Sequence, residues 1–201
     1  MRSQILASVE DSIAALEQLK RPESLLFIEQ ASAMLIDCYK RGSKVLIAGN
    51  GGSLCDAVHF AEELTGFFRG KRKALPAIAL AEPGHITCVG NDIGFDAIFS
   101  RGIEAYGKPG DVFIGLSTSG NSSNIVQAVE AAKHAGLKVI TLLGKGGGQL
   151  KDEADLQLVV DRFKTSDRIQ EVHMAILHIL VEMIEVGLFQ PLTPEMAIPV
   201  S

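Results

Sequence analysis

Apolar residues along the chain follow two periodicities, and each periodicity predicts one kind of element. Short continuous apolar runs are typical of parallel strands buried on both faces. Five such runs occur, at residues 44–48, 76–80, 111–117, 138–143 and 156–160. Segments with apolar residues three or four positions apart lie around these runs and predict helices. This alternation predicts a doubly wound α/β/α sandwich with a five-stranded, mostly parallel sheet.

Two helices are expected before the first strand. The first, residues 3–19, ends before Pro22 and repeats apolar residues at helical spacing: Ile5, Val9, Ile13 and Leu16. The second runs from about residue 23 to residue 40 and stops at Gly42, and its expected buried positions include Leu26, Ala33 and Leu35. Because both precede the sheet, we expect them to pack across it or against a partner subunit.

The chain is expected to form one domain over residues 1–190, since no linker interrupts the pattern. A last helix begins near Ser166, and its expected buried side comprises Ile169, Val172, Ile176, Ile179, Leu180 and Met183. Three prolines in the following segment predict an irregular tail over residues 191–201.

Composition narrows the class of protein. A hydrophobic content of 47% and a formal charge of −5 are ordinary for a globular domain and argue against a nucleic-acid-binding protein. Three scattered cysteines, Cys38, Cys55 and Cys88, form no CxxC motif and are expected to be reduced, mostly buried thiols of a cytoplasmic protein. No apolar run is expected to approach a membrane span, and no membrane association is predicted.

A glycine-rich turn follows the first strand and opens a helix. Residues 49–52, Gly-Asn-Gly-Gly, allow a sharp change of chain direction, and Ser53 is the expected N-cap of the helix. A helix N-terminus at such a turn presents free N–H groups and a partial positive charge, which suit a phosphate group.

A second loop, residues 117–122, follows the third strand in the same way. It carries four hydroxyl groups around one glycine, on Ser117, Thr118, Ser119 and Ser122. Both loops leave the carboxyl edge of a parallel sheet, where ligands bind in open α/β folds. Ordinary turn and capping chemistry is the alternative interpretation. A third polar turn is expected at residues 90–92, after the apolar segment 85–89.

Two nucleotide-binding interpretations are excluded by the first loop. Leu54 occupies the place of the third glycine of GxGxxG, and no GKS or GKT sequence is present. The loops therefore favour a phosphorylated small molecule as the ligand.

His59 and Glu63 are four residues apart, so they share one face of the helix that follows the glycine-rich turn. They form either a metal or acid/base pair or an ordinary helix pair, and the spacing is not that of HExxH. His85, His134 and His173 are interpreted as structural. The basic residues 69–73 are expected to form a solvated loop.

Four motifs in order resemble the bacterial phosphoheptose isomerases of the sugar-isomerase (SIS) domain family. They are GNGGSxCDAxHFAEELTG, CVGNDxGF, STSGNS and DRIQExHxxxxHIL, and the resemblance runs from about Ser3 to Leu188. It implies the SIS fold and an aldose–ketose isomerase of sedoheptulose 7-phosphate and D-glycero-D-manno-heptose 7-phosphate, in heptose biosynthesis for lipopolysaccharide or related glycans. It also implies cytoplasmic homotetramers, with N- and C-terminal helices packing in the oligomer, and one zinc ion (Zn2+) per subunit.

The resemblance also implies roles for particular residues. The metal ligands fall on His59, Glu63, Gln170 and His178. The substrate contacts fall on Asn50, Gly51, Gly52, Ser53, Glu63, Asn91, Asp92, Ser117, Thr118, Ser119, Ser122 and Gln170. Among these residues, Glu63 is the expected catalytic base and His178 the expected second acid/base. The family usually continues LTG with Arg and an aromatic residue, whereas this chain has Phe67, Phe68 and Arg69.

One difficulty and two alternatives accompany these assignments. Gln170 and His178 are about 12 Å apart along a straight helix, so a neighbouring subunit is expected to complete the metal site, or one ligand to be loose. A non-catalytic SIS-domain sugar-phosphate-binding protein and a replication-initiator-binding protein are the alternatives. The combination of His59, Glu63 and His178 favours the enzyme.

Overall fold

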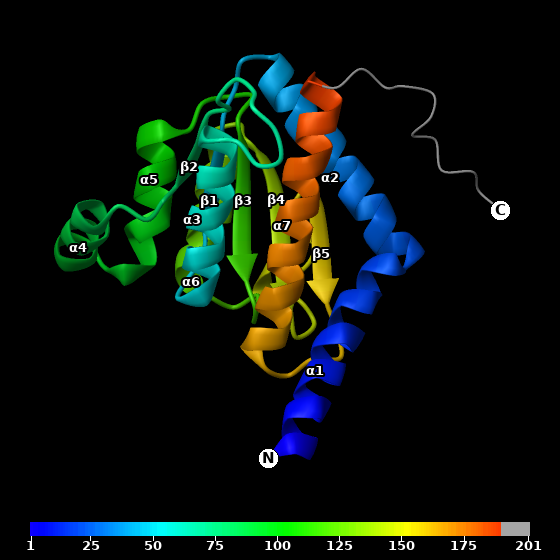
Figure 1. Cartoon of the computed structure of the whole chain (residues 1–201). Coiled ribbons are helices and arrows are strands. Elements are labelled where there is room, and N and C mark those ends of the chain that lie inside the picture. The colour runs from blue at the N-terminus through cyan, green and yellow to red at the C-terminus, as the bar shows by residue number, and fades with distance from the viewer. Residues whose placement is uncertain (190–201) are drawn as a thin grey trace.

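The computed structural model describes residues 1–189, so the irregular tail predicted for residues 191–201 lies outside the described residues. Within the described part, five strands form one sheet in the order β2-β1-β3-β4-β5 (Figure 1). The strands are β1 (Val45–Ala48), β2 (Ala77–Ala79), β3 (Val112–Ser117), β4 (Lys138–Gly144) and β5 (Leu156–Val160). Each pairing in this sheet is parallel, which confirms the predicted fold class.

Two hydrophobic cores lie on opposite faces of the sheet and are covered by different helices (Figure 1). One core is closed by α1 (Arg2–Glu17), α2 (Pro22–Lys40), α3 (Gly52–Thr65) and α7 (Ser166–Phe189). The other is closed by α4 (Pro83–Asp92), α5 (Ile98–Tyr106) and α6 (Ser123–His134). Successive strand residues reach opposite cores because side chains alternate along a strand. Three single-turn 3-10 helices complete the described elements: η1 (Gln18–Lys20), η2 (Phe95–Ala97) and η3 (Gly148–Leu150).

Helix α4 replaces the polar turn that was predicted at residues 90–92. Its start signals are local: Pro83 occupies the first helical turn, and the Glu82 carboxylate accepts two of the free backbone N–H groups there. The glycine and asparagine that suggested a turn therefore lie inside the last turn of a helix. Helix α5 likewise has no counterpart among the predicted elements.

Helix α2 presents a different face to the core from the predicted one. Leu35 is buried as expected, but Leu26 is 53% exposed and Ala33 is also exposed. The buried face of α2 begins one residue after Leu26 and follows the helical repeat. It comprises Phe27, Ile28, Ala31, Leu35 and Cys38. The predicted positions did not share one face of a 3.6-residue repeat, which explains the error.

Helix α1 extends beyond the sheet at one end of the molecule (Figure 1). Within the described chain it buries Ala15, whereas its apolar residues are between 40% and 58% exposed. We call these residues the α1 stripe: Ile5, Leu6, Val9, Ile13 and Leu16. The sequence pattern was amphipathic, but the apolar side of the helix does not face the core of the described chain.

Helix α7 is long and apolar enough to cross a membrane by length and composition, contrary to the expectation that no run approaches a span. In the structure it instead packs against α1, α2 and α3, and Ile169, Val172, Ile176 and Leu180 are buried. Ile179 and Met183 are half-buried, short of the full burial that was predicted. The apolar composition of α7 is thus explained by its place in the core.

Candidate active site

The glycine-rich turn lies between β1 and α3, and α3 begins two residues earlier than its capping chemistry suggested. Gly51, with φ +55°, is the N-cap, so the prediction of Ser53 as N-cap is wrong. Ser53 instead lies buried in the first turn of the helix, where its Oγ accepts a hydrogen bond from Gln170 Nε2 at 3.3 Å. The turn needs glycine at Gly49, because a Cβ there would lie 2.6 Å from the Ser53 carbonyl oxygen.

The hydroxyl-rich loop after β3 is held by its own hydrogen bonds. Ser117 Oγ accepts the N–H of Gly120 at 3.1 Å and lies 3.2 Å from Ser122 Oγ. Ser119 Oγ accepts the N–H of Asn121 at 3.1 Å. These contacts are turn chemistry, part of the alternative that the sequence left open, whereas Ser122, the N-cap of α6, makes no side-chain capping hydrogen bond within the described residues. They fix the hydroxyl groups of Ser117, Ser119 and Ser122 at the carboxyl end of β3 and are compatible with a ligand there. The hydroxyl of Thr118 instead lies 3.2 Å from Ser166 Oγ at the start of α7.

An amide pair joins the two loops. Asn50 Nδ2 donates to Asn124 Oδ1 at 2.8 Å, and Asn124 Nδ2 donates to Asn50 Oδ1 at 2.9 Å. Since Asn124 lies in the first turn of α6, the pair brings the starts of α3 and α6 together at one edge of the sheet. The predicted convergence of both loops is therefore present. Asn124 was missed by the sequence reasoning, since its partner is 74 residues away.

Three of the four predicted metal ligands gather between α3 and α7. One ligand atom each from His59, Glu63 and His178 lies within 4.8 Å of the others. His59 Nε2 and Glu63 Oε1 are 3.2 Å apart, and the rings of His59 and His178 meet edge to face, with centroids 5.0 Å apart. Burial, and next the charge of His59, lower the pKa of His178, which favours the neutral imidazole that a metal ion requires.

Gln170 lies about two turns away from His178 along α7, beside the start of α3. Its amide lies so close to Gly52 that a Cβ there would be 2.7 Å from Gln170 Oε1, and it donates to Ser53. The structure thus places Gln170 with the glycine-rich turn, and His59, Glu63 and His178 further along the same pair of helices. The assignment of Gln170 as a fourth metal ligand stays a prediction.

Asn91 and Asp92 lie at the end of α4 and are exposed. Among the described residues their side chains bond each other (2.7 Å), and Cys88 Sγ donates to Asp92 at 3.6 Å. Cys88 and Cys55 are exposed and only Cys38 is buried, so the expectation of mostly buried cysteines is wrong. The structure does not join them to the two loops by a side-chain hydrogen bond within the described chain. Their assignment as substrate contacts stays a prediction.

Asp56 is a further acidic residue of helix α3, and sequence reasoning missed it. It precedes His59 by three positions, and its Oδ2 is buried without a hydrogen-bond partner among the described residues. Burial raises the pKa of this carboxyl group to about 6, and the nearby His59 opposes that shift. The signal in the sequence was the shared helical face of residues 56, 59 and 63.

The donor set of the cluster fits a zinc ion. Catalytic zinc sites combine three protein ligands, commonly two imidazoles and one carboxylate, with an open position. His59, Glu63 and His178 supply that combination, and their ligand atoms lie close enough together to converge on one ion.

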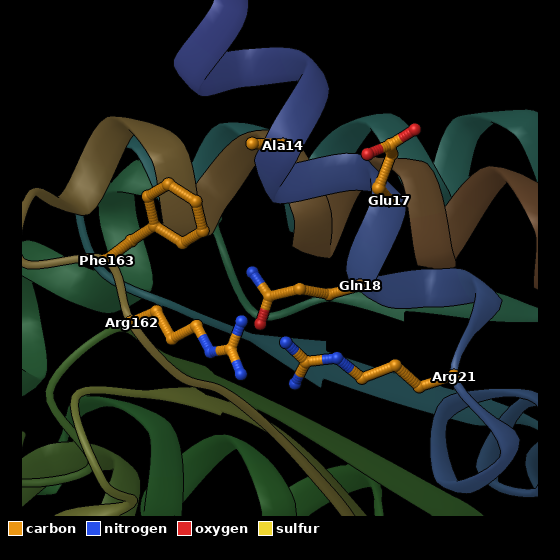
Figure 2. Close-up of a pocket in the computed structure, with 6 residues that line it drawn as sticks. All are labelled: Ala14, Glu17, Gln18, Arg21, Arg162 and Phe163. Carbon is orange, nitrogen blue, oxygen red and sulfur yellow. The ribbon is translucent and has the colours of Figure 1, made fainter.

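A separate cavity of about 320 Å³ lies near the end of α1 and the segment before α7 (Figure 2). Its lining residues are Ala14, Glu17, Gln18, Arg21, Arg162 and Phe163. Both arginine side chains extend toward the middle of the group in Figure 2, but Arg21 is also paired with Asp161 at 3.2 Å. None of the predicted site residues lines this cavity.

The fold and the two loops at one sheet edge are those of a sugar-isomerase domain. The sequence model of the SIS domain matches residues 9–144, which is more than half of the chain. The chain therefore belongs to the SIS domain family.

Individual relatives define the group within that family. The chain is 57% identical over 157 residues to a phosphoheptose isomerase of Fusobacterium nucleatum, covering 78% of this chain and 80% of that protein. It is 53% identical over 167 residues to a phosphoheptose isomerase of Yersinia enterocolitica, covering 83% and 86% of the two chains. The structure of the phosphoheptose isomerase GmhA from Neisseria gonorrhoeae superposes with a TM-score of 0.84 at 37% identity, covering 92% and 98%. The chain is a member of the phosphoheptose isomerases.

Proposed function

We propose that this isomerase interconverts sedoheptulose 7-phosphate and D-glycero-D-manno-heptose 7-phosphate through an enediolate, in heptose biosynthesis for lipopolysaccharide or related glycans. Two findings support the proposal together. The relatives that are more than half identical to the chain are phosphoheptose isomerases. The cluster of His59, Glu63 and His178 lies on the same two helices as the glycine-rich turn, so proton-handling groups and a phosphate-binding edge serve one ligand.

The phosphate end of the substrate is assigned to the two loops. The first-turn N–H groups of α3 and α6 and the hydroxyl groups of Ser53, Ser117 and Ser122 surround the sheet edge that the Asn50–Asn124 pair holds together. A fixed phosphate at one end of a seven-carbon chain positions the carbons at the other end, so that remote binding supplies orientation at the reacting centre.

The chemical step is assigned to Glu63 and His178. The Glu63 carboxylate removes the proton from C1 of the ketose and returns it to C2, which leaves the carbonyl group at C1. His178 serves as the second acid/base for ring opening or for the substrate oxygens. Glu63 is about one-fifth exposed, so the carboxylate is shielded yet accessible to a ligand from one side.

Zinc, one ion per subunit, is proposed to be held by His59, Glu63 and His178, with Gln170 as a fourth ligand. When bound, such an ion supplies a Lewis acid that polarises the substrate carbonyl. Gln170 lies beside Gly52 and Ser53, which supports its proposed contact with the substrate between the phosphate end and the reacting carbons.

The assembly is proposed to be a cytoplasmic homotetramer. The α1 stripe offers an apolar surface that this subunit leaves uncovered, of the kind that a second copy buries. A neighbouring subunit is proposed to complete the active site near the segment after α3, where Phe67, 55% exposed, stands in place of the family's usual arginine.

The test compares the wild type with Glu63→Gln in an isomerase assay on sedoheptulose 7-phosphate. Glu63→Gln is expected to lose at least about 1000-fold in kcat, at the larger end of the range for a general base, while calorimetry still detects substrate binding through the loops. Chelation should abolish wild-type turnover, and added zinc should restore it. An active Glu63→Gln variant would remove Glu63 as the base. Turnover that is unchanged by chelation would remove zinc from the proposal.

A further inference from the structure

Arg72 is the buried member of a basic loop that was expected to be solvated. Its side chain is 4% exposed, which corrects that expectation for one residue of the segment 69–73. The guanidinium donates to the carbonyl oxygens of Glu63 at 2.6 Å, Leu64 at 2.7 Å and Gly66 at 2.8 Å. These carbonyls belong to the end of α3, where a helix leaves its acceptors without internal partners. Arg72 therefore caps the helix that carries His59 and Glu63.

Glu185 joins the same guanidinium to α7. Its Oε1 accepts a hydrogen bond from Arg72 Nε at 2.7 Å, and its side chain is 8% exposed. The carboxylate also accepts the backbone N–H groups of Phe68 at 3.2 Å and Arg69 at 3.3 Å. One buried carboxylate on α7 thus holds both Arg72 and the segment that leaves α3.

The two residues reach the candidate active site through short chains of contact. Arg72 holds the main chain of Glu63 itself. Glu185 holds the main chain of Phe68, and the Phe68 ring stacks on His178, with centroids 5.5 Å apart and planes 25° apart. The Arg72–Glu185 ion pair therefore supports both parts of the site. It holds the main chain of Glu63 on α3, and it holds the main chain of Phe68, whose ring packs on His178 of α7.

Stability alone does not account for a pair of this kind. Replacing a buried ion pair by apolar side chains of similar volume is often neutral or stabilising, because both charges must lose their water. The planar fork of arginine, in contrast, fixes the direction of several donors at once, which lysine does not. What the pair provides is the relative placement of two helix segments.

We propose that Arg72 and Glu185 are positioning residues for the active site: they fix the end of α3 against α7 so that Glu63 and His178 converge. This inference rests on the proposed function of that site as a metal-assisted isomerase centre. It assigns neither residue a contact with the substrate.

The experiment uses Arg72→Lys and Glu185→Gln, with Asp111→Asn as the matched control. The Asp111 carboxylate also accepts three donors, from Lys44 N (3.0 Å), Lys44 Nζ (2.5 Å) and Lys108 N (2.9 Å), and its side chain is 4% exposed. It precedes β3, at the sheet edge opposite the loops. All variants are first shown to be folded by circular dichroism at the assay temperature.

Three measurements are made on each folded protein: zinc affinity by calorimetry on metal-free protein, kcat and KM, and the ring-proton chemical shifts of His178. Arg72→Lys and Glu185→Gln should weaken zinc binding by about 10–100-fold, the range for groups that orient ligands. They should lower kcat with little change in KM, because the phosphate loops lie at the other end of α3. The His178 shifts should move as the Phe68 ring leaves it. Asp111→Asn should lower the melting temperature and leave these quantities unchanged.

Unchanged zinc affinity and unchanged His178 chemical shifts in both folded variants would overturn the proposal. Equal losses of zinc affinity and kcat in Asp111→Asn would overturn it as well. Failure of the proposed function gives a different result, namely a wild type that neither binds zinc nor turns over the sugar phosphate. In that case His178 shifts that move in the two variants and not in the control still support positioning, and shifts that stay in place overturn it.

Discussion

His173 shows how one buried residue makes the stability of the molecule depend on pH. It is fully buried on α7, and its Nε2 lies 3.0 Å from the Leu143 carbonyl oxygen, which requires a protonated Nε2. Nδ1 is buried without a partner among the described residues. Burial lowers the pKa of His173 from 6.5 to about 4, the hydrogen bond to Leu143 opposing the shift. The interpretation of this histidine as structural agrees with these contacts.

The expected pH dependence follows from the sign of that shift. Between pH 6.5 and about 4 the unfolded chain binds a proton at His173 that the folded chain excludes. The free energy of unfolding therefore has its full value above pH 6.5 and falls by up to about 1.4 kcal/mol per pH unit through that window. Urea unfolding of the wild type and of His173→Gln at several pH values measures it. Equal slopes for the two proteins would contradict the assignment.

Residue-level prediction succeeded where the partners are close in the sequence. His59 and Glu63 could be placed on one helical face from their spacing, whereas His178 was assigned to the same site only through the family resemblance. The structure brings the three side chains together. Arg72 was misjudged, because its burial depends on Glu185, 113 residues further along the chain. Composition showed a basic segment but could not show which of its side chains turns inward.

At the scale of elements, the loops after β3 and β4 pack backbone against backbone. The Leu150 N–H donates to the Gly120 carbonyl oxygen at 3.1 Å, and the Gln149 N–H donates to Asn121 Oδ1 at 3.0 Å. Gly120 has φ +66°, and a Cβ there would lie 1.8 Å from the Gly147 carbonyl oxygen. The loop after β4 leaves no room for a side chain at position 120. Glycine there is therefore what allows the hydroxyl-rich loop to pack against the loop after β4 in this shape.

Gly120→Ala should consequently destabilise the protein more than Gly146→Ala. Gly146 is a matched control, because it has φ +84° but no other group of residues 1–189 lies within 4 Å of the position that a Cβ would take. The positive φ alone costs about 1–2 kcal/mol in either variant, and the backbone clash adds about 1–3 kcal/mol for Gly120→Ala. Urea unfolding measures both. Equal decreases in the free energy of unfolding of the two variants would show that the loop after β4 moves aside without cost.

Helices and strands could be predicted where the apolar pattern along the sequence is uninterrupted. The five strands were found because buried parallel strands read as unbroken apolar runs, and the fifth matches residues 156–160 at both ends. Helix α4 was missed because a glycine and an asparagine in its last turn outweighed the Pro83 and Glu82 start signals. The face of α2 could not be assigned from apolar residues alone, since Leu25 and Leu26 are exposed while Phe27 and Ile28 are buried.

At the scale of the whole molecule, the α1 stripe is an apolar surface that the described residues leave uncovered. Val9→Glu places a charge in the middle of the stripe and is expected to weaken self-association at least about tenfold, because the charge would be buried in the proposed interface. Light scattering after gel filtration measures the mass. Ala7→Glu is the control, since Ala7 is exposed on the same helix but lies outside the stripe. A Val9→Glu protein with the mass of the wild type would place the interface elsewhere.

In the proposed oligomer another copy covers the apolar side of α1, so that folding is coupled to association. The docking of α1 would then obey mass action: dilution would favour an open, partly undocked α1, and higher protein concentration would raise the melting temperature. Helix α1 also packs on α7, where Arg168 donates to Ser8 at 2.6 Å, two residues before Gln170. Dissociation of the proposed oligomer at low protein concentration would thus loosen α7, the helix that carries Gln170 and His178. Specific activity would then fall with dilution before the sheet unfolds.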